Sequence, residues 1–243
     1  RSIVWAVDSL AAPEGTAGPA DLVHIAYPMH LKFFNTMIPT QPLFWVLHAG
    51  LYQRCSGDAE LIRTLLPAIR RNLAAMDGWR NADGLLESIP SWMFFDYADI
   101  RTDGVSVALN GVYARTLDEA ARLERLAGDA ARAEAFEKHA RQARDSLNRL
   151  CPGEAFYPDV LVRDPQRQNL VPAPQACETT QTFVLWGNVP PPDRQRRMWR
   201  PCATIFSPRR SKKSSRSAAS PAQGFILSRS VWKWLAGWAT MRR

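Results

Sequence analysis

Acidic and aromatic side chains crowd into one stretch of the chain, residues 83–100, which reads DGLLESIPSWMFFDYADI. Proline at position 90 cannot lie inside a helix and favours extended backbone before it, so we predict a loop. Aromatic faces beside carboxylates that accept hydrogen bonds from hydroxyls are what a sugar pocket requires. The alternative is a buried aromatic cluster whose acids face solvent. The side chains concerned are Glu87, Trp92, Phe94, Phe95, Asp96, Tyr97 and Asp99.

Two pairs of predicted helices flank this loop, one pair on each side. In each pair the first helix has an almost uncharged apolar stretch, which is typical of an inner helix, and the second has one apolar stripe, which is typical of an outer helix. A Gly-Asp dipeptide separates the two, because glycine adopts the left-handed conformation at a helix end and aspartate caps the next helix. The predicted helices are 40–55 and 59–76, joined at Gly57 and Asp58, and 105–127 and 130–150, joined at Gly128 and Asp129.

The recurrence of inner and outer helices predicts an all-α fold of helical hairpins. Residues 178–186, ETTQTFVLW, are predicted to begin a third inner helix, and a run FYPDVLV before them is predicted to supply a strand of a small hairpin. A regular solenoid would repeat every ~34–47 residues. The Gly-Asp turns lie 71 residues apart. This long connection favours part of an α/α six-hairpin toroid, whose loops build a pocket at one end.

The basic net charge of +8 comes from the C-terminal part of the chain. Residues 194–243 contain 13 Lys and Arg and no acid, so the first 193 residues carry a net charge of −5. We therefore expect two parts. Residues 1–190 form a partial toroid, and residues 191–243 form a basic tail that is disordered or aberrant, for example through translation in a shifted frame. The tail alone could motivate binding to nucleic acid or a membrane, and we expect neither.

Length and composition exclude several other classes of protein. The chain has 243 residues, 46% of them hydrophobic, which is enough for a globular core, and no apolar run long enough for a transmembrane helix. Its four cysteines and four histidines lack metal-ligand spacing, so we expect no metal, no cofactor and no disulfide framework. The sequence begins with Arg rather than Met, so an upstream segment could have been removed. The cytoplasm is slightly favoured as the compartment.

The order of these segments resembles the six-hairpin catalytic domain of bacterial α-L-rhamnosidases. The resemblance spans roughly residues 20–190. It implies hydrolysis of terminal α-L-rhamnosyl groups with inversion, by a carboxylic acid and a carboxylate base about 6.5–9.5 Å apart. Four blocks carry it: 38–73 (IPTQPLFWVLHAGLYQRCSGDAELIRTLLPAIRRNL), 83–100, 104–129 (GVSVALNGVYARTLDEAARLERLAGD) and, more weakly, 178–187 (ETTQTFVLWG).

The resemblance also implies which residues bind the sugar. In the family a Trp-x-Phe-x-Asp-Trp segment lines the pocket, and here Trp92, Phe94 and Asp96 match it, with Tyr97 in place of the second tryptophan. Trp92 would stack on an apolar face of the sugar, and Asp96 would accept hydrogen bonds from its hydroxyls. Each further acidic candidate has a solvated loop acid or a helix cap as its alternative. These further candidates are Glu87, Asp99, Asp103 and Glu178.

Neither catalytic carboxylate of the family has a counterpart here. The general acid belongs to an acidic motif that residues 1–37 lack, and the general base belongs to a Trp-Glu motif that is absent from Arg194 onward. We therefore assign no catalytic residue and predict an incomplete, inactive fragment that binds a carbohydrate. The alternatives are another α/α-toroid glycosidase, acting on glucosides or uronides, and a helical-repeat interaction protein. The oligomeric state is left open.

Overall fold

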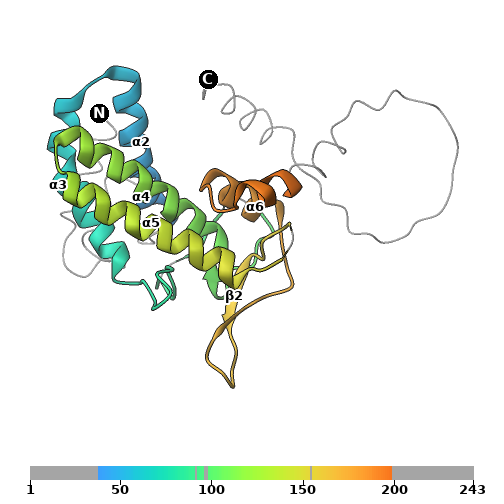
Figure 1. The fold of residues 1–243 in the computed structure, drawn as a ribbon. Helices are drawn as coiled ribbons and strands as arrows, with labels where there is room; N and C mark the ends of the chain where they lie inside the picture. Colours follow the sequence, from blue (N-terminus) through green and yellow to red (C-terminus); the bar gives the residue numbers. More distant parts are fainter. Residues whose placement is uncertain (1–37, 91, 96–97, 154, 199–243) are drawn as a thin grey trace, which may run out of the picture.

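The fold of the chain is mostly helical, as the sequence predicted (Figure 1). The computed structural model describes residues 38–90, 92–95, 98–153 and 155–198. The named helices are α2 (Thr40–Ser56), α3 (Ala59–Asp77), α4 (Val107–Ala127), α5 (Ala130–Leu150) and α6 (Glu178–Trp186). Strands β1 (Val105–Ser106), β2 (Val160–Arg163) and β3 (Leu170–Pro172) form a small antiparallel sheet in the order β1-β2-β3.

The predicted Gly-Asp junctions occur at the ends of α2 and α4. Gly57 and Gly128 both adopt the left-handed conformation, with φ of 72° and 90°. The side chain of Asp58 then accepts a hydrogen bond from the backbone N–H of Leu61. In the second junction, the side chain of Asp129 accepts one from the backbone N–H of Arg132. Each junction thus ends an inner helix and caps the outer helix that follows it, which confirms the prediction.

The helix α4 is the centre of the fold. It packs against α2, α3, α5 and α6, and most of its side chains are buried on every side of the helix. By contrast, α3 and α5 bury one face each and leave charged side chains on the other. The inner layer is therefore α2, α4 and α6, and α3 and α5 belong to the outer layer, as predicted. Near its C-terminal end α2 leaves Leu51 and Tyr52 exposed to solvent.

The start of α4 differs from the sequence prediction, which began this helix at Val105. Val105 and Ser106 instead form β1, which pairs with β2. The Ser106 hydroxyl accepts a hydrogen bond from the backbone N–H of Leu109 and so caps α4. A β-branched residue followed by a hydroxyl residue suits an extended cap better than a first helical turn. The predicted small hairpin is present as β2 and β3.

Described structure continues past residue 190, where the sequence predicted the tail to begin. Residues 192–198 are helical. Within them Arg194 is buried, and its guanidinium carbon lies 3.5 Å from the centre of the Tyr157 ring. The same guanidinium donates hydrogen bonds to the backbone carbonyls of Cys151, Ala155 and Phe156. These contacts hold residues 192–198 against the loop after α5. The rest of the predicted tail, residues 199–243, lies outside the described part, as do residues 1–37.

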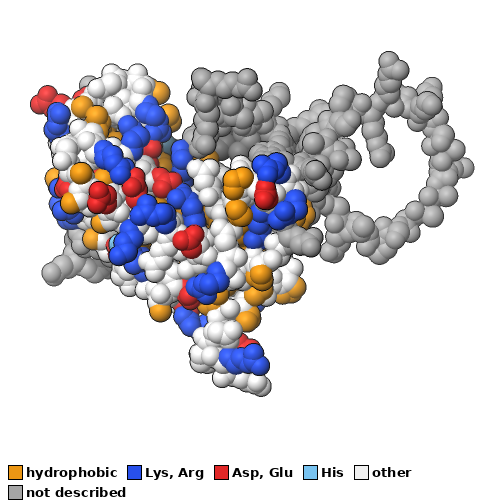
Figure 2. Space-filling model, in the orientation of Figure 1, with side chains coloured by type: hydrophobic (Ala, Val, Ile, Leu, Met, Phe, Trp, Pro, Cys, Tyr) orange, Lys and Arg blue, Asp and Glu red, His pale blue; other side chains and the backbone are white. Residues whose placement is uncertain are grey.

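Basic and acidic side chains are intermixed on the surface over α4 and α5 (Figure 2). Many are ion pairs between helices, such as Arg144 with Asp118 and Arg125 with Glu137. Within the described ranges, no helix is long and apolar enough to span a membrane.

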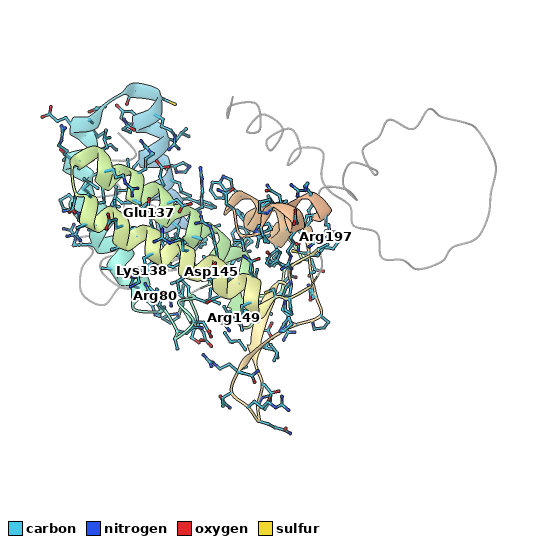
Figure 3. All side chains as sticks on the ribbon, viewed as in Figure 1. Arg80, Glu137, Lys138, Asp145, Arg149 and Arg197 are labelled. Carbon is cyan, nitrogen blue, oxygen red and sulfur yellow. The ribbon has the colours of Figure 1, made fainter. Side chains whose placement is uncertain are left out.

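His139 of α5 belongs to a charged cluster at the end of α3. Its Nδ1 atom lies 2.6 Å from Nη1 of Arg80 and 3.8 Å from a carboxylate oxygen of Asp77. The hydroxyl of Tyr113 donates to the other Asp77 oxygen at 2.5 Å. Figure 3 shows Arg80 beside α5, near Lys138. Burial and the nearby charge of Arg80 lower the pKa of His139 below its usual 6.5, and Lys138 acts in the same direction.

Stability is expected to fall as this histidine becomes protonated. Because the folded-state pKa of His139 is depressed, its contribution is fully present above pH 6.5 and is lost as the pH falls through the folded-state pKa. We expect His139→Gln to flatten the fall in the free energy of unfolding between about pH 7.5 and about pH 5. Urea unfolding at several pH values measures this. If His139→Gln keeps the wild-type pH dependence, protonation of His139 is not the cause of the fall.

Candidate functional site

A cavity of about 360 Å³ lies at the N-terminal ends of α2 and α6, next to the loop before α4. Three separate segments of the chain meet there: the first turns of two inner helices and the aromatic part of the 83–100 loop. The first turn of a helix presents backbone N–H groups and a positive dipole end, which favour oxygen atoms of a ligand. The lining residues are Thr40, Gln41, Phe44, Phe94, Phe95, Glu178, Thr179, Thr182 and Phe183.

Aromatic rings form the apolar wall of this cavity. The ring of Phe183 lies 5.6 Å from that of Phe95 and 6.3 Å from that of Phe44, measured between centroids. Trp186, one turn further along α6, packs on Phe44 with centroids 6.0 Å apart. Tilted rings at these distances are favourable aromatic pairs. The wall therefore joins α2, α6 and the loop, and it is a rigid apolar surface for a ligand to contact.

The polar side of the cavity comes mainly from α6. Glu178, Thr179, Thr182 and Phe183 follow at one- and three-residue steps, which places them on one face of a helix. Glu178 is the first residue of α6, where an anion interacts favourably with the helix dipole. A carboxylate can accept hydrogen bonds from the hydroxyl groups of a ligand, and the two threonine hydroxyls beside it can donate or accept them.

Asp159 holds the start of α6 in place. This carboxylate is fully buried, and one of its oxygens accepts hydrogen bonds from the backbone N–H of Cys177 at 2.8 Å and the hydroxyl of Thr180 at 2.6 Å. Its other oxygen faces the backbone N–H of Arg101 at 3.4 Å. Asp159 therefore links the loop before α4, the strand β2 and the helix that carries Glu178. Sequence reasoning missed it, because nothing in the spacing joins Asp159 to a helix that begins 19 residues later.

Asp159→Asn is expected to lower the free energy of unfolding by about 1 kcal/mol, as one member of a buried hydrogen-bond network is altered. The amide oxygen of Asn can still accept hydrogen bonds from the backbone N–H of Cys177 and the hydroxyl of Thr180. The amide N–H₂ group, however, then faces the backbone N–H of Arg101, and two donors repel each other. Urea unfolding measures the loss. The control is Asp145→Asn at an exposed position of α5 (Figure 3), which should leave stability unchanged. Equal effects of the two substitutions would contradict this role of Asp159.

The structure brings two of the predicted sugar-binding residues into the cavity wall, Phe94 and Glu178. Trp92 is not among the lining residues. Its side chain is exposed, and its ring packs on that of Phe94 with centroids 4.8 Å apart. Asp96 and Tyr97 lie outside the described residues, so the predicted role of Asp96 stays a prediction. Sequence reasoning did not single out Phe183, Thr179 and Thr182, although their helical spacing from Glu178 was a usable signal.

Glu87 and Asp103 contact protein groups, and Glu87, Asp99 and Asp103 are not among the residues that line the cavity. Both oxygens of Glu87 accept hydrogen bonds from Arg163 on β2, at 2.7 and 2.5 Å. This pairing with Arg163 is the main cause that holds the pKa of Glu87 below its usual value. Asp103 is exposed and pairs with Arg101. The structure thus gives Glu87 and Asp103 contacts that stabilise the loop before α4.

Among the residues that the structure describes, no three His, Cys, Asp or Glu side chains gather in a way that could hold a metal ion. Glu178 is the acidic residue among the described residues that line the cavity. These described residues form a binding pocket with a carboxylate, several hydroxyls and an aromatic wall.

The chain is a mostly helical domain of α/α hairpins with a cavity at the N-terminal ends of its inner helices, and solved structures share this fold. No family model and no curated protein sequence matches the chain. A GH78 family rhamnosidase of Bacillus sp. GL1 matches 68% of it with a TM-score of 0.59, and a Klebsiella oxytoca rhamnosidase with rhamnose bound matches 69% with a TM-score of 0.54. Sequence identity is 20% in both cases.

The likeness to these two structures shows the fold. It confirms the predicted class of helical hairpins that form part of an α/α toroid. The match covers 17% of the Bacillus chain and 30% of the Klebsiella chain. The present chain therefore spans less than a third of either protein.

Proposed function

We propose that this chain is part of a glycoside hydrolase domain of the α-L-rhamnosidase kind and that its cavity binds the rhamnosyl group. The observation that supports this most is the composition of the cavity wall: phenylalanine rings on one side, and Glu178, Thr179 and Thr182 on the other. Rhamnose is a 6-deoxy sugar, so it offers a methyl group and an apolar ring face together with several hydroxyls. A volume of about 360 Å³ suits a monosaccharide and falls in the usual range of small-molecule sites.

The proposed roles follow from the two sides of the cavity. Phe94 and Phe183 contact the apolar face of the sugar, and Glu178 accepts hydrogen bonds from its hydroxyls. Asp96 is proposed as a second hydroxyl acceptor from the sequence resemblance. The catalytic acid and base of the family have no counterpart in this sequence, so we propose binding without turnover.

Calorimetric titration of the purified chain tests the proposal. L-rhamnose is expected to bind, and glucose and glucuronic acid are expected to bind at least about tenfold more weakly. A sugar whose hydroxyls do not match the site leaves polar groups of the protein without hydrogen-bond partners, which lowers its affinity. Preference for glucose or glucuronic acid would favour another toroid glycosidase. No sugar binding by the folded protein would contradict the proposal and favour an interaction protein. With p-nitrophenyl α-L-rhamnoside we expect no release of p-nitrophenol, and clear turnover would overturn the predicted inactivity.

Glu178→Gln is expected to weaken rhamnose binding by about tenfold, because it replaces a charged hydrogen-bond acceptor with a neutral one. The control is Glu134→Gln at an exposed position of α5, which makes the same change of charge away from the cavity. It should leave the dissociation constant unchanged. If both variants bind rhamnose like the wild type, Glu178 does not contact the sugar.

A further inference from the structure

Trp92 is an exposed aromatic residue at the cavity end of the fold. Its side chain is 54% exposed, although indole is among the largest apolar groups in proteins. The other large exposed apolar residues of the described part lie away from the cavity lining. They are Leu51 and Tyr52 near the C-terminal end of α2, Leu126 near the C-terminal end of α4, and Phe156 in the loop after α5.

An aromatic contact connects Trp92 to the cavity. Its ring and that of Phe94 lie 4.8 Å apart with their planes at 37°, and Phe94 lines the cavity. The two rings thus form a continuous apolar surface that runs from the cavity wall to the solvent. Trp92 itself is not among the residues that line the cavity.

We infer that Trp92 binds the group attached to the sugar, an aglycone with an aromatic or flat apolar face, rather than the sugar itself. The inference rests on the function proposed above. The cavity is open to solvent on one side, so the remainder of a glycoside whose sugar lies inside can extend past the rim. An exposed indole next to that rim gains from burying its apolar face against such a group. The resemblance had implied that Trp92 stacks on the sugar, and its position outside the cavity lining argues for this different role.

Two glycosides that differ only in the aglycone test the inference: methyl α-L-rhamnoside and p-nitrophenyl α-L-rhamnoside. The wild-type chain is expected to bind the aryl glycoside about three- to tenfold more tightly than the methyl glycoside, as one aromatic stacking contact provides. Trp92→Ala should abolish this difference and leave the affinity for the methyl glycoside unchanged. Trp92→Phe retains an aromatic face and should keep most of the difference. The control Leu51→Ala, which removes an exposed apolar side chain far from the cavity, should change neither affinity.

Each other outcome overturns the inference in its own way. If Trp92→Ala weakens both glycosides equally, Trp92 contacts the sugar or supports the cavity. If Trp92→Ala weakens the binding of neither glycoside, the indole does not contact the aglycone. If the wild type then forms a concentration-dependent dimer and Trp92→Ala is a monomer, this surface serves self-association. If the wild type binds the methyl glycoside but shows no preference for the aryl glycoside, the inference fails and the proposed function stands. If it binds neither glycoside, both fail.

Discussion

Arg70→Ala is expected to lower the free energy of unfolding by about 3 kcal/mol, because it leaves a buried carboxylate without its main partner. Glu124 of α4 is fully buried, and Nε and Nη2 of Arg70 on α3 hold its two oxygens at 2.8 and 2.5 Å. The next cation, Arg132, is 3.9 Å away. Removing Arg70 therefore leaves a buried charge between an inner and two outer helices, with the more distant Arg132 as its remaining ion-pair partner. Urea unfolding with linear extrapolation measures the loss.

Two variants separate this ion pair from a general effect of charge or helix propensity. Arg63→Ala makes the same substitution at an exposed position of the same helix and should change stability by less than about 0.5 kcal/mol. The double variant Arg70→Leu/Glu124→Leu removes both charges, so it should recover most of the loss, as apolar replacements of buried ion pairs often do. If Arg70→Ala is as stable as Arg63→Ala, Arg132 or solvent compensates Glu124 when Arg70 is absent.

The helices were predictable because their signals are local. The bounds of α5 agree with the prediction, since a capping aspartate begins the helix and one apolar stripe runs along it. The third inner helix, α6, was also found at its predicted place. The start of α4 was missed by two residues, because pairing of β1 with a strand that comes over 50 residues later decides the conformation of Val105 and Ser106.

The candidate site was predictable only in part, for the same physical reason. Phe94 and Glu178, both predicted to bind the sugar, line the same cavity, and their binding role stays a prediction. Composition identifies the loop, but the direction of each loop side chain depends on distant partners. Glu87 faces Arg163, which lies 76 residues away in the sequence. Trp92 and Phe94 stand two residues apart, yet only Phe94 reaches the cavity. The buried Asp159 bears no sequence signal at all, because its partners are the ends of other elements.

Gly111→Ala is expected to destabilise the fold and weaken rhamnose binding together. A Cβ atom at position 111 of α4 would lie 2.8 Å from the carbonyl oxygen of Phe183 and 3.1 Å from its carbon. Both are backbone atoms of α6, which cannot rotate away as a side chain would. Overpacking of this kind destabilises by about 3 kcal/mol, and alanine returns about 1 kcal/mol through its helix propensity. A net loss of about 2 kcal/mol follows.

The loss of binding is the more informative half of this prediction. The helix α6 must move away from α4 to admit the methyl group, and α6 carries Glu178 and Phe183 to the cavity wall. The control is Gly57→Ala, where the left-handed φ of 72° opposes alanine but the added Cβ would meet nothing within 4 Å. It should lose about 1 kcal/mol of stability through backbone strain alone and keep its affinity for rhamnose. If Gly111→Ala also keeps that affinity, the close approach of α4 and α6 does not set the geometry of the cavity.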